Sequence, residues 1–473
     1  MADRRARMAA KAAKRKAKEH TMVASAQDLL DGLKRVCARA GLEEPSGLER
    51  LTGGATMESW RFSSGEQDFV LRRAPSLAFM EDRPFGHDVE AAIIRTAHAK
   101  GVTAPHVVAE LEPDDAIGSG FVMQALPGTP NPKLILEMDD PSALLKQAAR
   151  DLARIHSLKP EALPEAVPVM DYRAAIADLR AQFKEAGGDR PIIALGLKWM
   201  EDNCPDPAEP VLNHGDYRMG NLLAEDSRLT GVLDWELAHF GDRHEDLAFG
   251  CMAVWRFHRY DRPALGLGSL EDYFAAYEAE SGVTVDRERF RYWLIHRTVW
   301  WALGCLKMAQ IWRSGEDRML ERVVISRRTS EQELDLLMLL EEDYGTTKKR
   351  PHFTRKQFPK DQGEANDGEL ASAVSEWLFS IKDQLHGHDR FQLAVARNAL
   401  GIIARNWEIG GYNSNKEMAR SFLKPGELDL SNLASLMPAL RRMTLDKVEA
   451  DSPKYPALAF ALKKWIPDEE GTE

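Results

Sequence analysis

The spacing of apolar residues changes once along this chain, near Pro130, and this change restricts the folds that the chain can adopt. Before it, apolar residues form short runs, such as residues 69–71 and 120–126, separated by turn-forming residues. Such runs predict short strands. After it, apolar residues such as Leu145 and Leu152 recur at helical spacing. The sequence therefore predicts an α+β fold, with a small β-rich part followed by a mainly helical part.

The β-rich part is predicted to be a small antiparallel sheet with one helix. Three extended runs come first: one ends at Leu51, and the others span residues 59–62 and 69–72. A turn-prone segment with Gly53 and Gly54 joins the first two, and a Ser-Ser-Gly-Glu turn joins the last two. A helical stretch and two further short runs follow, which completes the predicted sheet.

One extended segment interrupts the helical part. Apolar pieces at residues 221–223 and 231–233 flank a turn and predict a β-hairpin. Because a hairpin returns the chain to the end at which it started, we expect Asn221 and Asp234 to lie close together.

The length and the linker signals predict several units. A chain of 473 residues is too long for one domain of ordinary size. Residues 345–364 are rich in Lys, Arg and Pro, as linkers are, and helical spacing resumes after them. We expect a basic N-terminal arm, a small lobe, a large lobe with the catalytic loop, a basic linker and a helical accessory domain, at residues 1–26, 27–128, 129–344, 345–364 and 365–473.

Composition excludes several classes of function. A net charge of −11 repels polyanions, so no nucleic-acid partner is expected. The most apolar long stretch, residues 292–312, contains His296, Arg297 and Lys307, which predicts a buried helix and no membrane span. The four cysteines form no CxxC pair, and the basic residues 1–20 lack the apolar core of a signal peptide. We therefore expect a cytoplasmic protein.

The polar residues in the predicted hairpin and directly beside it match the needs of phosphoryl transfer. That reaction uses a carboxylate to orient the acceptor hydroxyl and receive its proton, oxygen ligands for Mg²⁺, and cations near the transferred group. Asp216 is the candidate carboxylate and Arg218 the candidate cation. Asn221 and Asp234 are the candidate metal ligands, because Mg²⁺ needs few protein oxygens when phosphates supply the rest.

This segment resembles a known family. The His-Gly-Asp sequence at residues 214–216, with Asn221 and Asp234, is similar to the catalytic loop and metal site of the aminoglycoside phosphotransferase family. Residues 241–247 resemble its Gly-Asp-Pro-x-x-Asp-Leu stretch, although Arg243 stands in the place of proline. Over residues 27–310 the resemblance implies a bilobal protein-kinase-like fold and the use of ATP and Mg²⁺. It also implies that His214 is structural and that Asp246 bonds the backbone of the catalytic loop.

The same resemblance implies a nucleotide site in the small lobe. Gly53 and Gly54 would lie in the loop that covers the phosphates. Arg72 would hold the α- and β-phosphates, with Glu90 as its ion-pair partner. Met123, Gln124 and Leu126 would form the hinge that contacts adenine.

The acceptor is predicted only by class. The motifs most resemble the branch related to the kinase portion of acyl-CoA-dehydrogenase fusion proteins, which implies a hydroxyacyl-CoA or hydroxy-acid acceptor. The cationic and aromatic residues 255–260, with His296 and Arg297, agree with an anionic or acyl acceptor, but they are equally typical of core packing. An aminoglycoside kinase and a non-catalytic nucleotide-binding scaffold are the alternatives. The helical accessory domain could form a homodimer or dock to an acyl-CoA dehydrogenase.

Overall fold

The computed structural model describes most of the chain, at residues 26–52, 57–74, 83–344, 365–409, 423–424, 427–428 and 433–466. Gly53 and Gly54, residues 1–25 of the predicted arm and the predicted linker lie outside these ranges.

The chain forms two compact units that interleave along the sequence. The first comprises Met1–Met170, Pro207–Cys251 and Asp261–Phe290, and the second comprises Asp171–Asp206, Met252–Tyr260 and Arg291–Glu473. The second unit contains helices from both the predicted large lobe and the predicted accessory domain, and the predicted domain boundaries stay a prediction. In the described residues, no helix is long and apolar enough to cross a membrane.

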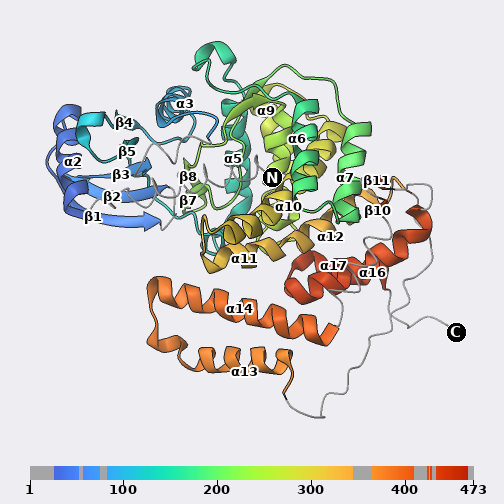
Figure 1. Ribbon diagram of the computed structural model, residues 1–473. Coiled ribbons are helices and arrows are strands. Elements are labelled where there is room, and N and C mark those ends of the chain that lie inside the picture. The colour runs from blue at the N-terminus through green and yellow to red at the C-terminus, as the bar shows by residue number, and fades with distance from the viewer. Residues whose placement is uncertain are drawn as a thin grey trace, which may run out of the picture. The chain divides into compact units, whose positions relative to one another are not determined.

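The first unit contains the predicted antiparallel sheet, which is confirmed (Figure 1). Its strands lie in the order β1-β2-β3-β5-β4, and each neighbouring pair is antiparallel. The strands are β1 (Pro45–Thr52), β2 (Glu58–Ser64), β3 (Gln67–Ala74), β4 (Val107–Glu110) and β5 (Ser119–Gln124). The helices of this part are α2 (Ala26–Ala40) and α3 (His87–Ala99).

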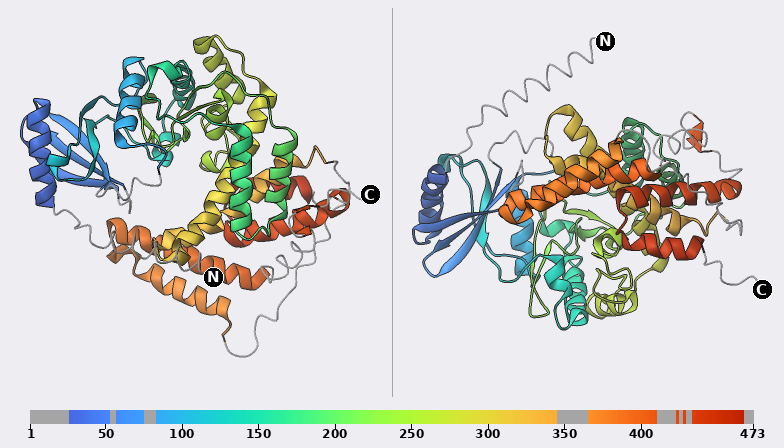
Figure 2. Two further views of the ribbon diagram at one scale, coloured as in Figure 1. Left: turned by 45° about the horizontal axis from the view of Figure 1, so that its top comes forward. Right: turned by 90° about the horizontal axis from the view of Figure 1, so that it is seen from below.

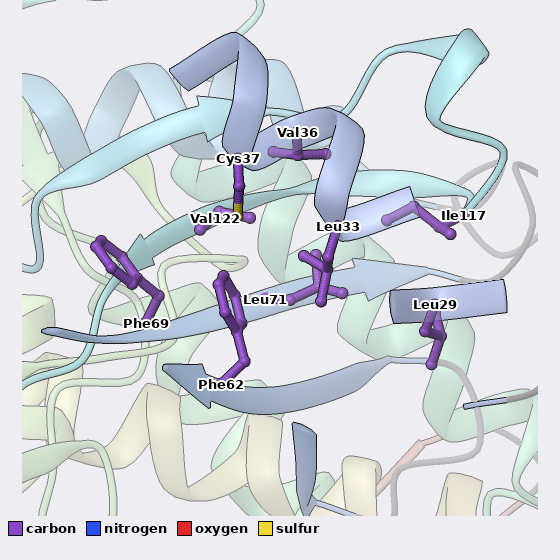
Figure 3. Close-up of a cluster of buried hydrophobic side chains, with 9 residues drawn as sticks. All are labelled: Leu29, Leu33, Val36, Cys37, Phe62, Phe69, Leu71, Ile117 and Val122. Atoms are coloured by element: carbon purple, nitrogen blue, oxygen red, sulfur yellow. The ribbon is translucent and has the colours of Figure 1, made fainter. Parts of the chain in front are cut away.

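Helix α2 covers one face of the sheet and closes a hydrophobic core (Figure 3). Its apolar residues recur at helical spacing, so they share one face and point together at the strands. Phe62 and Phe69 stack with their ring centroids 5.7 Å apart. The core contains Leu29, Leu33, Val36, Cys37, Phe62, Phe69, Leu71, Ile117 and Val122.

Strand alternation places the two arginines at the end of β3 on opposite faces. Phe69 and Leu71 are buried in the core under α2, and Arg73 follows them with the same period. Arg73 is buried and pairs with Glu58 at 2.8 Å. Arg72 therefore points to the other face, where it contacts α3 through Glu90.

The predicted hairpin is also confirmed. It consists of β7 (Leu222–Glu225) and β8 (Arg228–Val232), which pair antiparallel. A second pair, β6 (Val211–Asn213) and β9 (His239–Gly241), brackets it in the sequence. Helices α4 (Pro132–Leu136), α5 (Pro141–Ile155), α8 (Arg243–Phe249) and α9 (Leu270–Ser281) also belong to the first unit.

The second unit is helical in its described residues, apart from the short pair β10 (Leu423–Lys424) and β11 (Glu427–Leu428). Helices α13 (Asp367–Ser380) and α14 (Gly387–Ile409) lie side by side as a hairpin, as Figure 1 and the left view of Figure 2 show. Its helices are α6 (Tyr172–Glu185), α7 (Pro191–Asp202), most of α10 (Arg287–Ser314), α11 (Leu320–Arg327), α12 (Thr329–Leu340), α13 (Asp367–Ser380), α14 (Gly387–Ile409), α16 (Leu433–Asp451) and α17 (Pro456–Trp465).

Buried polar contacts attach the last two helices to α12 and to the residue that follows it. Arg441 of α16 donates to Glu341 at 2.7 Å, and Tyr455, just before α17, donates to Asp335 at 2.6 Å. Lys447 pairs with Glu333. Because a buried charge is costly without a partner, these pairs fix how α16 and α17 dock on α12.

Candidate active site

The catalytic loop follows β6, and one buried carboxylate binds its backbone. Asp246, in α8, accepts hydrogen bonds from the backbone N–H groups of His214 at 2.5 Å and Gly215 at 2.9 Å. Burial raises the pKa of Asp246, but its contacts with His156 and His214 outweigh burial and lower the pKa overall. The buried carboxylate therefore stays ionised and fixes the loop, as the resemblance implied.

Gly215 is required by the shape of this loop. Its φ of +82° is strained for other residues. A Cβ atom there would lie 2.4 Å from the carbonyl oxygen of Leu237, which is backbone and cannot move aside easily. The loop can therefore pass close to the segment after Asp234 only with glycine at this position.

Asp216 lies in the loop with its carboxylate oriented from two sides. Arg218 donates to both oxygens, through Nε at 2.7 Å and Nη2 at 3.1 Å. Asn221 donates from Nδ2 to Oδ2 at 2.6 Å. Burial raises the pKa of Asp216 above its usual range, and Arg218 offsets part of that effect. The result is a fixed carboxylate with a raised pKa, which suits a group that receives a proton.

The position of Arg218 differs in detail from its predicted role. The sequence predicted a cation near the γ-phosphate, whereas the structure shows a two-point ion pair with Asp216. This pair was not predictable from the sequence, because the residues are two positions apart in a loop without a regular period. A role at the γ-phosphate stays a prediction.

The hairpin brings the two candidate metal ligands to one end of the site. Leu233 donates its N–H to the carbonyl of Asn221 at 2.8 Å, which ties the residue before Asp234 to Asn221. The imidazole Nε2 of His214 lies 3.0 Å from the Leu233 carbonyl oxygen, and its ring packs on Trp235 at 4.8 Å. His214 thus acts as a structural residue that fixes the approach to Asp234.

The donor set fits a hard cation. Asn221 uses its Nδ2 for Asp216, so its side-chain oxygen is the atom that a metal ion would contact. Asp234 supplies a carboxylate from a strained backbone with φ of 69°. Oxygen ligands of this kind suit Mg²⁺, which takes its other ligands from water and phosphate.

Arg72 connects the sheet, α3 and the metal side of the site. It lies 3.0 Å from Glu90, as predicted, and its Nη2 donates to Asp234 at 2.7 Å and to Glu236 at 2.8 Å. Burial raises the pKa of Glu90 to about 7, and Arg72 opposes that effect. The three carboxylates together raise the pKa of Arg72 against the effect of burial, so its guanidinium keeps its charge.

Two residues of this cluster, Arg83 and Glu236, were not predicted from the sequence. Glu236 accepts from both Arg72 and Arg83. The Asp-Trp-Glu order at residues 234–236 was visible in the sequence, but the contact depends on how distant segments pack.

The predicted hinge lies at the end of β5, next to the catalytic hairpin. The N–H of Gln124 donates to the carbonyl of His106 at 2.8 Å, so an adenine ring would have to use other backbone groups there. The Leu126 side chain packs against Gly231 of β8. Contact of Met123, Gln124 and Leu126 with adenine stays a prediction.

The cationic and aromatic residues that were considered for acceptor binding, residues 255–260 with His296 and Arg297, belong to the second unit. Trp255, His296 and Arg297 are buried there. The guanidinium of Arg297 lies 5.0 Å from the Trp300 ring, and that of Arg256 lies 5.4 Å from the Tyr260 ring. These contacts agree with the core-packing alternative, and a role in acceptor binding stays a prediction.

The support from Asp246 gives a stability prediction. Asp246→Asn is expected to lower the free energy of unfolding by about 1–3 kcal/mol, because an amide can offer only one oxygen to the two backbone N–H groups. The midpoint of urea unfolding measures the effect, with the exposed Asp178→Asn as control. Equal midpoints for the two variants would show that Asp246 does not support the loop.

Comparison with known proteins identifies the family of this chain. Residues 47–291, a little over half of the chain, match the model of the phosphotransferase enzyme family. Acyl-CoA dehydrogenase family member 10 of Mus musculus is 27% identical over 260 residues, which cover 50% of this chain and 24% of that protein. Hygromycin-B 4-O-kinase of Escherichia coli is 26% identical over 222 residues, which cover 43% of this chain and 61% of that protein. The chain thus spans less than two thirds of either relative.

Solved structures show the same fold. A Ralstonia eutropha protein described as an aminoglycoside phosphotransferase superposes with a TM-score of 0.54 and 19% identity, covering 66% of this chain and 98% of that one. The family match and this likeness confirm the predicted kinase-like fold. Because the family model matches more than half of its sequence, the chain belongs to the phosphotransferase enzyme family.

Proposed function

We propose that this protein transfers the γ-phosphate of ATP to a hydroxyl group of a small molecule, with Mg²⁺ as cofactor. One observation carries the proposal. The contacts described above connect Asp216, Asn221 and Asp234 with one another and with Arg72 in a single site. A protein that only bound nucleotide would not need an oriented carboxylate beside the metal ligands. This argues against the scaffold alternative.

The proposed reaction is a single displacement. The acceptor hydroxyl oxygen forms a bond to the γ-phosphorus while the bond from that phosphorus to the β,γ-bridging oxygen breaks, which releases ADP. Asp216 receives the hydroxyl proton, and Arg218 and Asn221 hold its carboxylate in place. Arg72 binds the phosphates. When bound, Mg²⁺ neutralises phosphate charge, and Asn221 and Asp234 would hold it.

For the acceptor we propose a hydroxyacyl-CoA or a hydroxy acid. The support is the match to the acyl-CoA dehydrogenase relative, although the aligned part is 24% of that protein. An aminoglycoside or similar amino alcohol is the second candidate, supported by the match to hygromycin-B 4-O-kinase. We also propose that residues 365–473 form a dimer or dock to an acyl-CoA dehydrogenase. We further propose that the protein acts in the cytoplasm.

An acceptor panel tests this function. Purified protein with Mg²⁺ and ATP is assayed for ADP release with hydroxyacyl-CoAs, hydroxy acids and aminoglycosides in parallel. We expect ADP release that depends on one acceptor class and that is absent from Asp216→Asn. Release with aminoglycosides alone would favour the second candidate, and tight ATP binding without turnover on any acceptor would favour the scaffold.

A further inference from the structure

Glu236 lies between two arginines that come from different segments. Nη2 of Arg72 and Nη2 of Arg83 lie 2.8 Å and 2.7 Å from the same oxygen, Oε2 of Glu236. The two arginine side chains are mostly buried, with 14% and 19% of their surface exposed, whereas Glu236 is 32% exposed. One carboxylate oxygen therefore serves two guanidinium groups at the edge of the proposed phosphate site.

The arginines are arranged as they would be around a phosphate. A carboxylate and a phosphate offer a guanidinium the same acceptor geometry, and two converging guanidinium groups favour a group with more oxygens and more charge than one carboxylate. Arg72 also holds Oδ1 of Asp234. A metal ion on Asp234 would compete for that carboxylate and leave Arg72 with Glu90 and Glu236, so part of the charge of Arg72 would be available to a phosphate.

Both arginines also lie close enough to the buried residue His87 to affect its ionisation. His87 begins α3, is buried, and has its Nδ1 2.9 Å from the hydroxyl of Ser119. Burial, then Arg72, then Arg83 lower the pKa of His87 to about 3. The imidazole therefore stays neutral, and Arg72 and Arg83 are the cations that act on it.

We propose that Arg83 is a second phosphate-binding residue of this site, and that Glu236 holds Arg83 and Arg72 in position until the nucleotide binds. The inference rests on the proposed function, because it requires a nucleoside triphosphate beside Arg72. The competing explanation is a purely structural ion pair that ties the segment before α3 to residues 234–236. A structural pair would affect stability and would not distinguish nucleotides by their number of phosphates.

Nucleotide discrimination tests the proposal. Calorimetry with the full chain and Mg²⁺ measures the dissociation constants of ATP, ADP and AMP for wild type, Arg83→Gln and Arg83→Lys. Loss of one charge-assisted contact is expected to weaken ATP binding by about 10- to 100-fold in Arg83→Gln, with AMP binding little changed. Arg83→Lys should recover part of the loss, because it restores the charge without the forked geometry.

The control is Arg95→Gln, which removes a half-exposed arginine of α3 that pairs with Glu110. It should leave the ratio of the ATP and AMP dissociation constants unchanged. If wild type binds Mg-ATP and Arg83→Gln keeps the wild-type ratio, the role of Arg83 is refuted while the proposed function stands. If Arg83→Gln does not fold, the ratio for Arg83→Lys decides in the same way. If wild type does not bind Mg-ATP, both the proposed function and the role of Arg83 are refuted.

Discussion

Asp216→Asn is expected to lower kcat for the acceptor-dependent reaction by about 10²- to 10⁴-fold, the usual contribution of a positioned proton acceptor. The amide has nearly the shape of the carboxylate, but it cannot take up the hydroxyl proton. It also removes the charge that Arg218 pairs with at 2.7 Å. Steady-state ADP release with a saturating acceptor measures the loss.

Nucleotide binding separates a catalytic role of Asp216 from a structural one. The dissociation constant of Mg-ATP should change little in Asp216→Asn, because Arg72 and Asp234 remain. Asp178→Asn, on the exposed side of α6, is the matched control and should keep the wild-type kcat. Turnover at the wild-type rate in Asp216→Asn would exclude Asp216 as the proton acceptor.

Asp234→Asn is expected to weaken the Mg²⁺-dependent part of ATP binding by at least about 10- to 100-fold, the range seen even when residues that only support metal ligands are changed. The backbone should tolerate the change, because asparagine accepts positive φ as readily as aspartate, and φ here is 69°. The measurement is the ATP dissociation constant with Mg²⁺ and again with the metal chelated.

The measurement with the metal chelated makes this prediction specific to metal binding. Without metal, ATP binding should be as tight as in wild type or tighter, since the substitution removes a negative charge from the site and releases Arg72 from its pair. Asp226→Asn is a close control, because Asp226 is exposed in the hairpin turn and also has positive φ, 49°. Equal losses with and without Mg²⁺ would contradict a metal-binding role for Asp234.

Local patterns were enough to predict the sheet and the hairpin. Short apolar runs separated by turn-forming residues predicted the strands, and a pleated strand such as β3 then buries alternate residues on one face. The approach of Asn221 to Asp234 followed from the return of the chain through β7 and β8. The Arg72–Glu90 pair was available only through the family resemblance, because nothing in either segment alone indicates its partner.

Other features depend on packing that the sequence does not display. Arg83 and Glu236 are 153 positions apart, and no local signal relates them. The grouping of helices into the two compact units also depends on packing between distant segments. The residues of α6 and α7 read as a continuation of the large lobe, yet they belong to the same compact unit as the helices near the C-terminus.

Phosphoryl transfer from ATP to the acceptor is tested by following the phosphate itself. Wild type and Asp216→Asn are incubated with Mg²⁺, ATP labelled in the γ-phosphate and the acceptor found in the panel, and the acceptor is then isolated and analysed by mass spectrometry. We predict a labelled phosphate ester on the acceptor hydroxyl with wild type and almost none with the variant. Label released only as inorganic phosphate, or equal ester formation by both proteins, would contradict it.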